Sequence, residues 1–260
     1  MSALTRQGSG DNASSFGLKI EAKFFFVDWR RIYLNKEEPY LLEENLVSKD
    51  PFDVFDIWFK NVASKSDISF EEINAVCFST SSNNRPSSRM VLMKDYGRNG
   101  FSFYTNYDSR KGKEIAANPF GCLLFYWPKV DRQIRVEGRI EKLPNELADD
   151  YWKKRPVKNR IGSKLSEQSK VIPSRNFLLE KKAKLEKLVE EEGETAVSRP
   201  ENWFAFKAFG TVFLMDLGGY RLVPDYFEFW QGQSDRIHDR IVFEKSNFNG
   251  SNWKIYRLSP

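Results

Sequence analysis

Residues 133–141 read Gln-Ile-Arg-Val-Glu-Gly-Arg-Ile-Glu, and aliphatic and charged side chains alternate along most of this stretch. Successive side chains of a β-strand point to opposite faces, so the pattern gives one apolar face and one charged face. The apolar face carries Ile134, Val136 and Ile140, and the charged face carries Arg135, Glu137 and Arg139. The stretch therefore predicts a half-buried strand in a sheet.

Similar strands are expected on both sides of this stretch, separated by turn residues such as Asn83-Asn84 and Gly97-Arg98-Asn99-Gly100. They cover Ala75–Thr80, Ser88–Lys94, Phe101–Asn106, Phe120–Trp127, Gly219–Trp230, Ile237–Glu244 and Trp253–Leu258. Closely spaced antiparallel strands favour a barrel. The predicted fold class is mainly β with α+β character, a β-barrel with peripheral helices.

Helices are expected around this barrel. The first can begin at Pro51 with Asp50 as its N-cap, because Phe52, Phe55, Phe59 and Val62 then recur at helical spacing. The others cover residues 108–118, Asn145–Lys154 and Ser174–Glu192. Residues 1–48 lack a sustained period and predict a flexible N-terminal arm, which leaves one domain over residues 49–260.

Composition argues against several classes of protein. A net charge of +5 with both signs interspersed is weak support for nucleic-acid binding, which needs a concentrated basic face. No apolar stretch reaches the roughly 18 to 20 residues that a membrane span needs. Cys77 and Cys122 lie far apart without metal-ligand spacing, so they predict buried free thiols and no metal site. A soluble, cytoplasmic protein is expected.

One basic cluster suggests an anionic ligand. Arg236, His238 and Arg240 alternate, and a strand over Arg236–Phe243 would place all three on one face. Like charges at such distances destabilise the fold unless an anion lies among them, and a guanidinium binds phosphate bidentately. The alternative is that Asp235 and Asp239 neutralise the arginines at a solvated hairpin.

A second phosphate signal lies at the start of the helix over residues 108–118. Asp108 or Ser109 can cap this helix, which puts Arg110 and Lys111 in its first turn. Cations there oppose the helix dipole, whereas a bound anion would reverse that effect. The alternative is that both side chains extend into water. Lys94 forms a third basic position, which would share a strand face with apolar residues and lack a partner there unless a ligand or a carboxylate supplies one. The alternative is a core strand with charged ends.

Six motifs in order make the chain resemble the pyridoxine (pyridoxamine) 5′-phosphate oxidase family. They are Arg85–Lys94, Phe103–Asn106, Ser109–Gly112, Arg132–Gly138, Gln168-Ser169 with Val171–Pro173, and Phe229–Arg240. The resemblance spans about residues 50 to 260. It implies an FMN-binding split β-barrel that works as a homodimer, with FMN at the subunit interface.

The resemblance also implies a reaction. FMN would oxidise pyridoxine 5′-phosphate or pyridoxamine 5′-phosphate to pyridoxal 5′-phosphate, and O2 would reoxidise the flavin with release of H2O2. The implied partners are these small molecules and a second copy of the chain, without nucleic acid or membrane. A different reading is a split-barrel flavin-binding protein that lacks this activity.

Family positions imply roles for individual residues. FMN would contact Arg89, Met90, Val91, Leu92, Met93, Lys94, Tyr104, Thr105, Arg110, Lys111, Gln133, Gln168, Ser169, Trp230 and Arg240, some of them from the partner subunit. Substrate would contact Lys94, Tyr151, Arg155, Asn159, Arg236 and His238. Arg236 and His238 would be catalytic, His238 more by positioning than as a general base.

The chain departs from the family pattern in three places, one of which is residues 1 to about 29. Asn159 stands where the family commonly has serine, which would alter the affinity for the substrate phosphate. Residues 204–217 form an atypical apolar insertion between Trp203 and Gly218. An apolar insertion must pack against the barrel or the dimer partner, because exposed it would form an aggregation-prone patch.

Overall fold

The structure is a computed structural model that describes residues 33, 40–65, 72–200, 217–246 and 252–260. The strands are β1 Ala75–Ser82, β2 Arg85–Leu92, β3 Asp95–Gly97, β4 Gly100–Asn106, β5 Phe120–Trp127, β6 Arg132–Lys142, β7 Leu217–Gln231, β8 Asp239–Lys245 and β9 Trp253–Arg257. The α-helices are α1 Pro51–Lys65, α2 Arg110–Ala117, α3 Asn145–Lys154, α4 Val157–Leu165 and α5 Arg175–Glu192. Short 3₁₀ turns lie at Glu43–Asn45, Pro128–Val130 and Glu194–Ala196.

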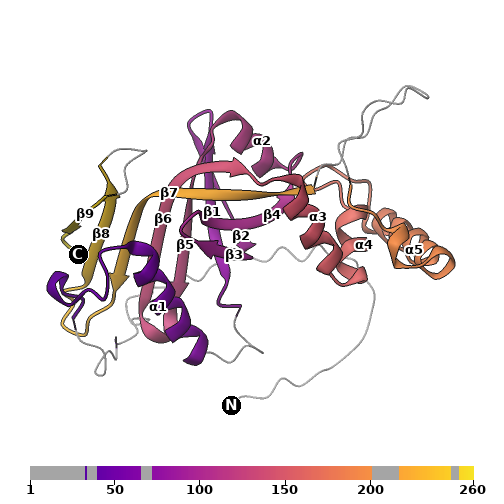
Figure 1. The fold of residues 1–260 in the computed structure, drawn as a ribbon. Coiled ribbons are helices and arrows are strands. Elements are labelled where there is room, and N and C mark those ends of the chain that lie inside the picture. The colour runs from indigo at the N-terminus through magenta and orange to yellow at the C-terminus, as the bar shows by residue number, and fades with distance from the viewer. Residues whose placement is uncertain (1–32, 34–39, 66–71, 201–216, 247–251) are drawn as a thin grey trace, which may run out of the picture. The chain divides into compact units, whose positions relative to one another are not determined.

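Within the described residues, nine strands form one antiparallel sheet in the order β2-β1-β5-β6-β7-β4-β3, with β8 paired to β7 and β9 paired to β8. The long strand β7 pairs with β6 along most of its length. On its other side, residues 217–222 pair with β4 and residues 226–231 pair with β8. The sheet therefore divides along β7, and β8 and β9 extend away from β4 (Figure 1).

The core forms between α1 and one face of this sheet. The ring of Phe55 is fully buried and meets Phe101 and Phe125 at centroid distances of 4.8 and 5.2 Å. Burial of such a side chain contributes about 1.5–3 kcal/mol. Asp50 caps α1 as expected, because its Oδ1 accepts a hydrogen bond from the backbone N–H of Phe52. The apolar face predicted from the helical spacing is confirmed, with Trp58 added to it.

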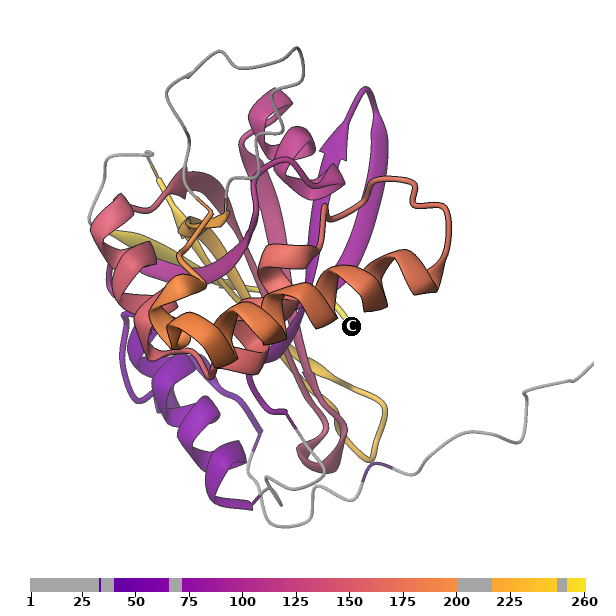
Figure 2. The ribbon, with the colours of Figure 1, turned by 90° about the vertical axis from the view of Figure 1, so that its right-hand side faces the viewer.

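Three helices form a smaller layer beside the barrel, where α5 runs alongside α4 (Figure 2). A separate cluster of buried residues holds this layer together: Trp152 from α3, Ile161 from α4, and Val197. Leu185 and Val189 of α5 pack against that cluster. The predicted helices Asn145–Lys154 and Ser174–Glu192 are confirmed, Ser174 being the N-cap of the second, whereas α4 and β3 were not predicted.

The predicted strand over Arg236–Phe243 is wrong in its first three residues. β8 begins only at Asp239, and Arg236 lies in a turn with φ of 72°. The Asp235 carboxylate accepts from the backbone N–H of Ile237, which stabilises this turn. Arg236, His238 and Arg240 therefore do not share one strand face.

Residues 40–48, assigned above to the flexible arm, pack against the C-terminal strands. The Leu41 backbone N–H donates to Asp239 Oδ2 at 3.0 Å, and Arg257 pairs with Glu43 at 2.8 Å. Leu41 and Leu46 also contact the core. Residues 40–48 therefore pack as part of the folded domain. The predicted insertion over residues 204–217 falls, except for Leu217 in β7, outside the described residues.

Both cysteines are free thiols, as expected, but each is half-buried and not fully buried. Among the described helices, none is long and apolar enough to cross a membrane.

Candidate active site

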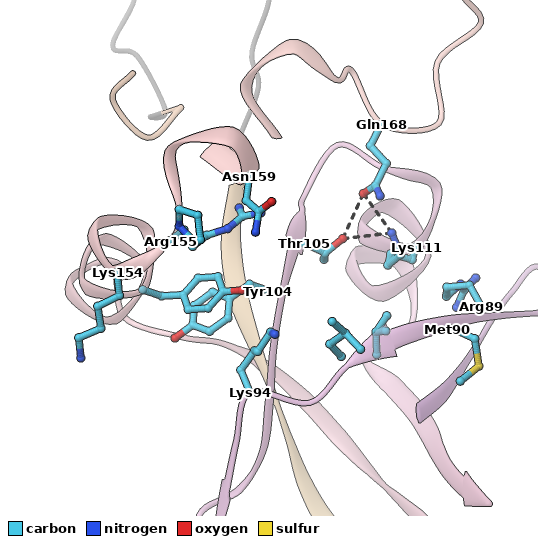
Figure 3. A pocket seen from close by; sticks show the side chains of 14 residues that line it. Arg89, Met90, Lys94, Tyr104, Thr105, Lys111, Lys154, Arg155, Asn159 and Gln168 are labelled. Atoms are coloured by element: carbon cyan, nitrogen blue, oxygen red, sulfur yellow. Dashed lines mark hydrogen bonds between the residues drawn. The ribbon is translucent and has the colours of Figure 1, made fainter. Parts of the chain in front are cut away.

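A cavity of about 670 Å³ opens between the strands β2 and β4, the start of α2, and the helices α3 and α4. Figure 3 shows its lining side chains. They are Arg89, Met90, Val91, Leu92, Lys94, Tyr104, Thr105, Lys111, Tyr151, Lys154, Arg155, Pro156, Asn159 and Gln168. Most of these are residues that the resemblance implied, and two segments far apart in the sequence supply them.

The charge of this lining is one-sided. Arg89, Lys94, Lys111, Lys154 and Arg155 are cationic, and no acidic residue belongs to the described lining. Arg89 and Lys111 lie on one side of the cavity, and Lys154 and Arg155 lie on the other (Figure 3). Like charges gathered in one cavity destabilise the empty site and favour anions. The lining thus fits a ligand set that carries negative charge at both ends.

Lys111 reaches the cavity because of how α2 begins. Ser109 is the N-cap, and its Oγ accepts from the backbone N–H of Gly112 at 3.3 Å. A Cβ on Gly112 would lie 1.9 Å from the Tyr107 carbonyl oxygen, so only glycine permits this close first turn. The expected helix, with Arg110 and Lys111 in its first turn, is confirmed.

The Lys111 ammonium is buried among neutral groups. Its Nζ donates to Thr105 Oγ1 at 3.0 Å and to Gln168 Oε1 at 3.1 Å, and Thr105 also donates to Gln168 (Figure 3). Burial, and then the charge of Arg89, lowers the pKa of Lys111 to about 8. A buried ammonium without a carboxylate in its hydrogen-bonding shell is a site prepared for an anion. This observation supports a phosphate in the cavity, which FMN would supply.

Arg89 is held inside the protein more tightly. Its Nη1 donates to Phe78 O and Thr80 Oγ1, and its Nη2 donates to Ser87 Oγ and Glu114 Oε2. These bonds occupy four of the five N–H groups of the guanidinium, which leaves Nε–H for a ligand. Arg89 therefore lines the cavity in an orientation fixed by its neighbours.

Arg110 and Ser169 lie outside the main cavity. They line a second hollow of about 390 Å³ together with Ser82, Asp108, Lys113, Glu114 and Lys170. Arg110 donates from Nε to Glu114 Oε1 at 2.8 Å, and its side chain is 60% exposed. Met93, also implied as a flavin contact, is 5% exposed in the core and does not line the cavity.

Two tyrosines of the cavity lining stack on each other. The rings of Tyr104 and Tyr151 stack at a centroid distance of 3.9 Å, and the Arg155 guanidinium lies 5.6 Å from the Tyr151 ring centroid. Burial, and then the neighbouring Tyr151, raises the pKa of Tyr104. Arg155 also donates to Ser163 Oγ at 2.8 Å, which fixes its guanidinium. Lys94, expected on a strand face, instead follows the end of β2 and is exposed at this cavity.

The remaining implied residues form a second group on β6, β7 and β8. Gln133 pairs with Trp230, which pairs with Arg240. Arg240 donates to the buried Glu228 at 2.7 Å, and Glu228 also accepts from Arg135 at 2.7 Å. None of the three paired residues lines the cavity. The predicted flavin contacts therefore fall into two separate groups on one chain.

His238 and Arg236 belong to this second group. The His238 ring lies 5.1 Å from the Trp230 ring and 5.1 Å from the Tyr33 ring. His238 Nδ1 accepts from the backbone N–H of Gln233 at 3.0 Å. Arg236 is exposed in the preceding turn. The single histidine is thus oriented by the loop and surrounded by aromatic rings.

Sequence reasoning missed several residues of these groups. Lys154 and Pro156 line the cavity, and the buried carboxylates of Glu114 and Glu228 each hold two arginines. The spacing of Arg110 and Glu114, four residues apart on a helix, was the one local signal for such a contact.

Two family models match the chain. The model described as pyridoxamine 5′-phosphate oxidase matches residues 67–187, and the model described as the pyridoxine 5′-phosphate oxidase C-terminal dimerisation region matches residues 218–260. A curated Bos taurus protein, pyridoxine-5′-phosphate oxidase, is 42% identical over 244 residues, covering 89% of this chain and 86% of its own. The chain belongs to the pyridoxamine 5′-phosphate oxidase family.

Other family members agree. A Burkholderia ambifaria pyridoxine/pyridoxamine 5′-phosphate oxidase is 43% identical over 220 residues, covering 84% of this chain and 93% of its own. The solved structure of PhzG from Burkholderia lata, in complex with tetrahydrophenazine-1-carboxylic acid, superposes with a TM-score of 0.69 at 26% identity and covers 86% of this chain and 98% of its own. Trp230, Arg236, His238 and Arg240 all lie in the region that matches the dimerisation model of the family.

Proposed function

We propose that this chain oxidises pyridoxine 5′-phosphate and pyridoxamine 5′-phosphate to pyridoxal 5′-phosphate, with FMN as cofactor and O2 as electron acceptor. The alcohol loses two electrons and two protons, and O2 takes them up as H2O2. With the amine, the same two-electron oxidation is followed by hydrolysis, in which the oxygen of water becomes the aldehyde oxygen and the nitrogen leaves as ammonia. The observation that carries this proposal is the cavity with cations on both sides and no acidic residue in its described lining, since cofactor and substrate each bring a phosphate.

The residues on the α2 side of the cavity fit the cofactor phosphate. Lys111 supplies a buried ammonium, Thr105 and Gln168 orient it, and Arg89 supplies a fixed guanidinium. Met90, Val91 and Leu92 add an apolar wall for a ring system. When bound, FMN supplies the redox chemistry by accepting electrons from the substrate and passing them to O2.

The residues on the α3 and α4 side fit the substrate phosphate. Arg155 is held by Ser163 and by the Tyr151 ring, and Asn159 and Lys154 lie beside it in the cavity lining. Lys94 stands at the same cavity with an exposed ammonium. A fixed guanidinium loses little entropy when it binds phosphate, so Arg155 is assigned the principal contact. Asn159 donates through its amide where serine would donate through its hydroxyl.

A second copy of the chain completes the site. The chain forms a homodimer, as the match to the dimerisation region of the family supports. Gln133, Trp230 and Arg240 lie away from the cavity of their own chain, so the partner's cavity is where they act. Arg236 and His238 lie in the turn between β7 and β8, so they would reach the partner's cavity together with Trp230 and Arg240.

His238 is assigned a positioning role. Its Nδ1 already accepts the Gln233 backbone N–H, so a neutral ring carries its proton on Nε2. In that form the ring donates a hydrogen bond and cannot take a proton at Nδ1 without losing the existing one. Arg236 adds positive charge near the same place. Together they orient the substrate, which contributes more to hydride transfer than a single base would.

FMN affinity is expected to fall as the pH rises above about 8. The pKa of Lys111 is lowered from 10.5 to about 8 by burial and then by Arg89, so the free protein loses this charge above that pH. The dissociation constant should then rise by up to about tenfold per pH unit. Fluorescence titrations between about pH 7 and 9 measure this, and riboflavin, which lacks the phosphate, is the matched control. Equal pH dependence for both flavins would contradict the assignment of Lys111.

The proposed function has a direct test. The purified protein is loaded with FMN, freed of excess cofactor, and assayed for H2O2 with pyridoxine 5′-phosphate, pyridoxamine 5′-phosphate and unphosphorylated pyridoxine. We expect peroxide with both phosphorylated substrates and at least about 100-fold lower kcat/KM without the phosphate, since Arg155 then loses a charge-assisted contact. A protein that holds FMN but releases no peroxide would instead be the flavin-binding split barrel without oxidase activity.

A further inference from the structure

Glu114 is a buried carboxylate at the point where β1, β2 and α2 meet. Its side chain is 10% exposed, and it does not line the main cavity. Oε2 accepts from Thr80 at 2.6 Å, from Ser87 at 2.7 Å and from Arg89 at 2.9 Å, whereas Oε1 accepts from Arg110 at 2.8 Å. The two oxygens thus hold two different arginines.

These contacts explain how two cations at the start of α2 coexist with a third on the strand β2. Arg89, Arg110 and Lys111 repel one another, and only Glu114 supplies negative charge to the two arginines within hydrogen-bonding distance among the described residues. Burial by itself would raise the pKa of Glu114, but the hydrogen bonds from Ser87, Thr80 and Arg110, with the charge of Arg89, lower it to about 2. The carboxylate therefore stays ionised throughout the neutral range.

We propose that Glu114 is a positioning residue that sets the preference for FMN over riboflavin by orienting the guanidinium groups of Arg89 and Arg110 beside Lys111. The inference rests on the proposed function, because it concerns how that site holds its cofactor. Arg89 lines the main cavity and Arg110 lines the second hollow, so Glu114 acts through both without lining the main cavity itself. A guanidinium fixed in advance binds phosphate at lower entropic cost than a mobile one.

Two substitutions test separately the charge of the Glu114 side chain and its length. Glu114→Gln keeps the length but has one acceptor oxygen, so it cannot accept from both arginines. Glu114→Asp keeps the charge but is one methylene shorter, so it cannot span the distance between Ser87 and Arg110. Glu190→Gln, on the exposed surface of α5, is the matched control.

The measurement is the ratio of the riboflavin and FMN dissociation constants, from fluorescence titrations of the apo protein. We expect both Glu114 variants to lower this ratio by about tenfold, which corresponds to one charge-assisted hydrogen bond, and Glu190→Gln to leave it unchanged. Unchanged riboflavin affinity shows that the variants are folded. A purely structural role would weaken both flavins equally, and an unchanged or increased ratio would overturn the proposal. If wild-type protein bound neither flavin, the proposed function would fail first.

Discussion

Replacing Lys111 with methionine is expected to weaken FMN binding by about 100-fold or more and to leave the purified protein colourless. Lys111 is 9% exposed, and among the described residues its ammonium donates to the neutral oxygens of Thr105, Gln168 and Ser109. A hydrogen bond to a charged group contributes about 1.5–3 kcal/mol, and a bound phosphate accepts more than one. Methionine keeps the length of the side chain but removes both the charge and the donors.

The same substitution should not destabilise the apo protein. Burial lowers the pKa of Lys111 to about 8, so the folded state holds the charged form less well than the unfolded chain does. That unfavourable contribution is fully present below pH 8 and disappears as the pH rises to the unfolded value of 10.5. At pH 7, therefore, Lys111→Met should melt at the wild-type temperature or above it.

The exposed Lys153 on α3 provides the control, because it lies beside Lys154 but does not line the cavity. Lys153→Met should retain FMN like the wild-type protein. Absorbance of the purified protein measures the retained flavin, flavin titration measures the FMN affinity, and thermal unfolding of the apo forms measures the melting temperature. Wild-type FMN affinity in Lys111→Met would show that the phosphate binds elsewhere.

Local sequence rules were sufficient where neighbouring residues decide the structure. Alternation over residues 133–141 predicted β6, and the position of Ser109 before Arg110 predicted the capped start of α2. Both features depend on contacts within a few residues. The same holds for Lys111, whose place in the first turn of a helix already indicated an anion.

Periodicity was misleading at the turn before β8. Alternation of Arg236, His238 and Arg240 suggested one strand face, but Asp235 accepts from the Ile237 backbone N–H and the chain turns there. Such side-chain hydrogen bonds compete with a strand and leave no mark on the hydrophobic pattern. His238 and Arg240 nevertheless both neighbour Trp230, His238 through a ring contact and Arg240 as its partner across the β7–β8 pair.

Contacts between residues far apart in the chain could not be predicted from the sequence. Glu114 is 34 residues from Thr80 and 25 from Arg89, so its role depends on how β1, β2 and α2 pack. Glu228 likewise accepts from Arg135, 93 residues away. Each buried carboxylate holds two arginines, one pair at the cavity side of the sheet and the other on the β7–β8 side. In the dimer proposed above, these two pairs would belong to the two halves of one site.

Two inactive variants are expected to restore activity when they share a dimer. Lys111→Met removes the cavity half of the site, and Arg236→Leu removes the half proposed to come from the partner. In a heterodimer of the two, one site combines an intact cavity with an intact second half, and the other site carries both substitutions. Since a twofold dimer has two equivalent sites, such heterodimers should show about half of the wild-type activity.

The experiment requires co-expression of the two variants with different affinity tags and purification through both tags in turn. Peroxide release with pyridoxine 5′-phosphate then gives the activity per dimer, and each variant homodimer gives the baseline. A second pair, Lys111→Met with Arg155→Met, is the control, because both substitutions lie in the cavity and every site of that heterodimer keeps one of them. Activity at the baseline in the first pair would mean that Arg236 serves the cavity of its own chain, whereas recovery in the first pair alone assigns the β7–β8 turn to the partner's site.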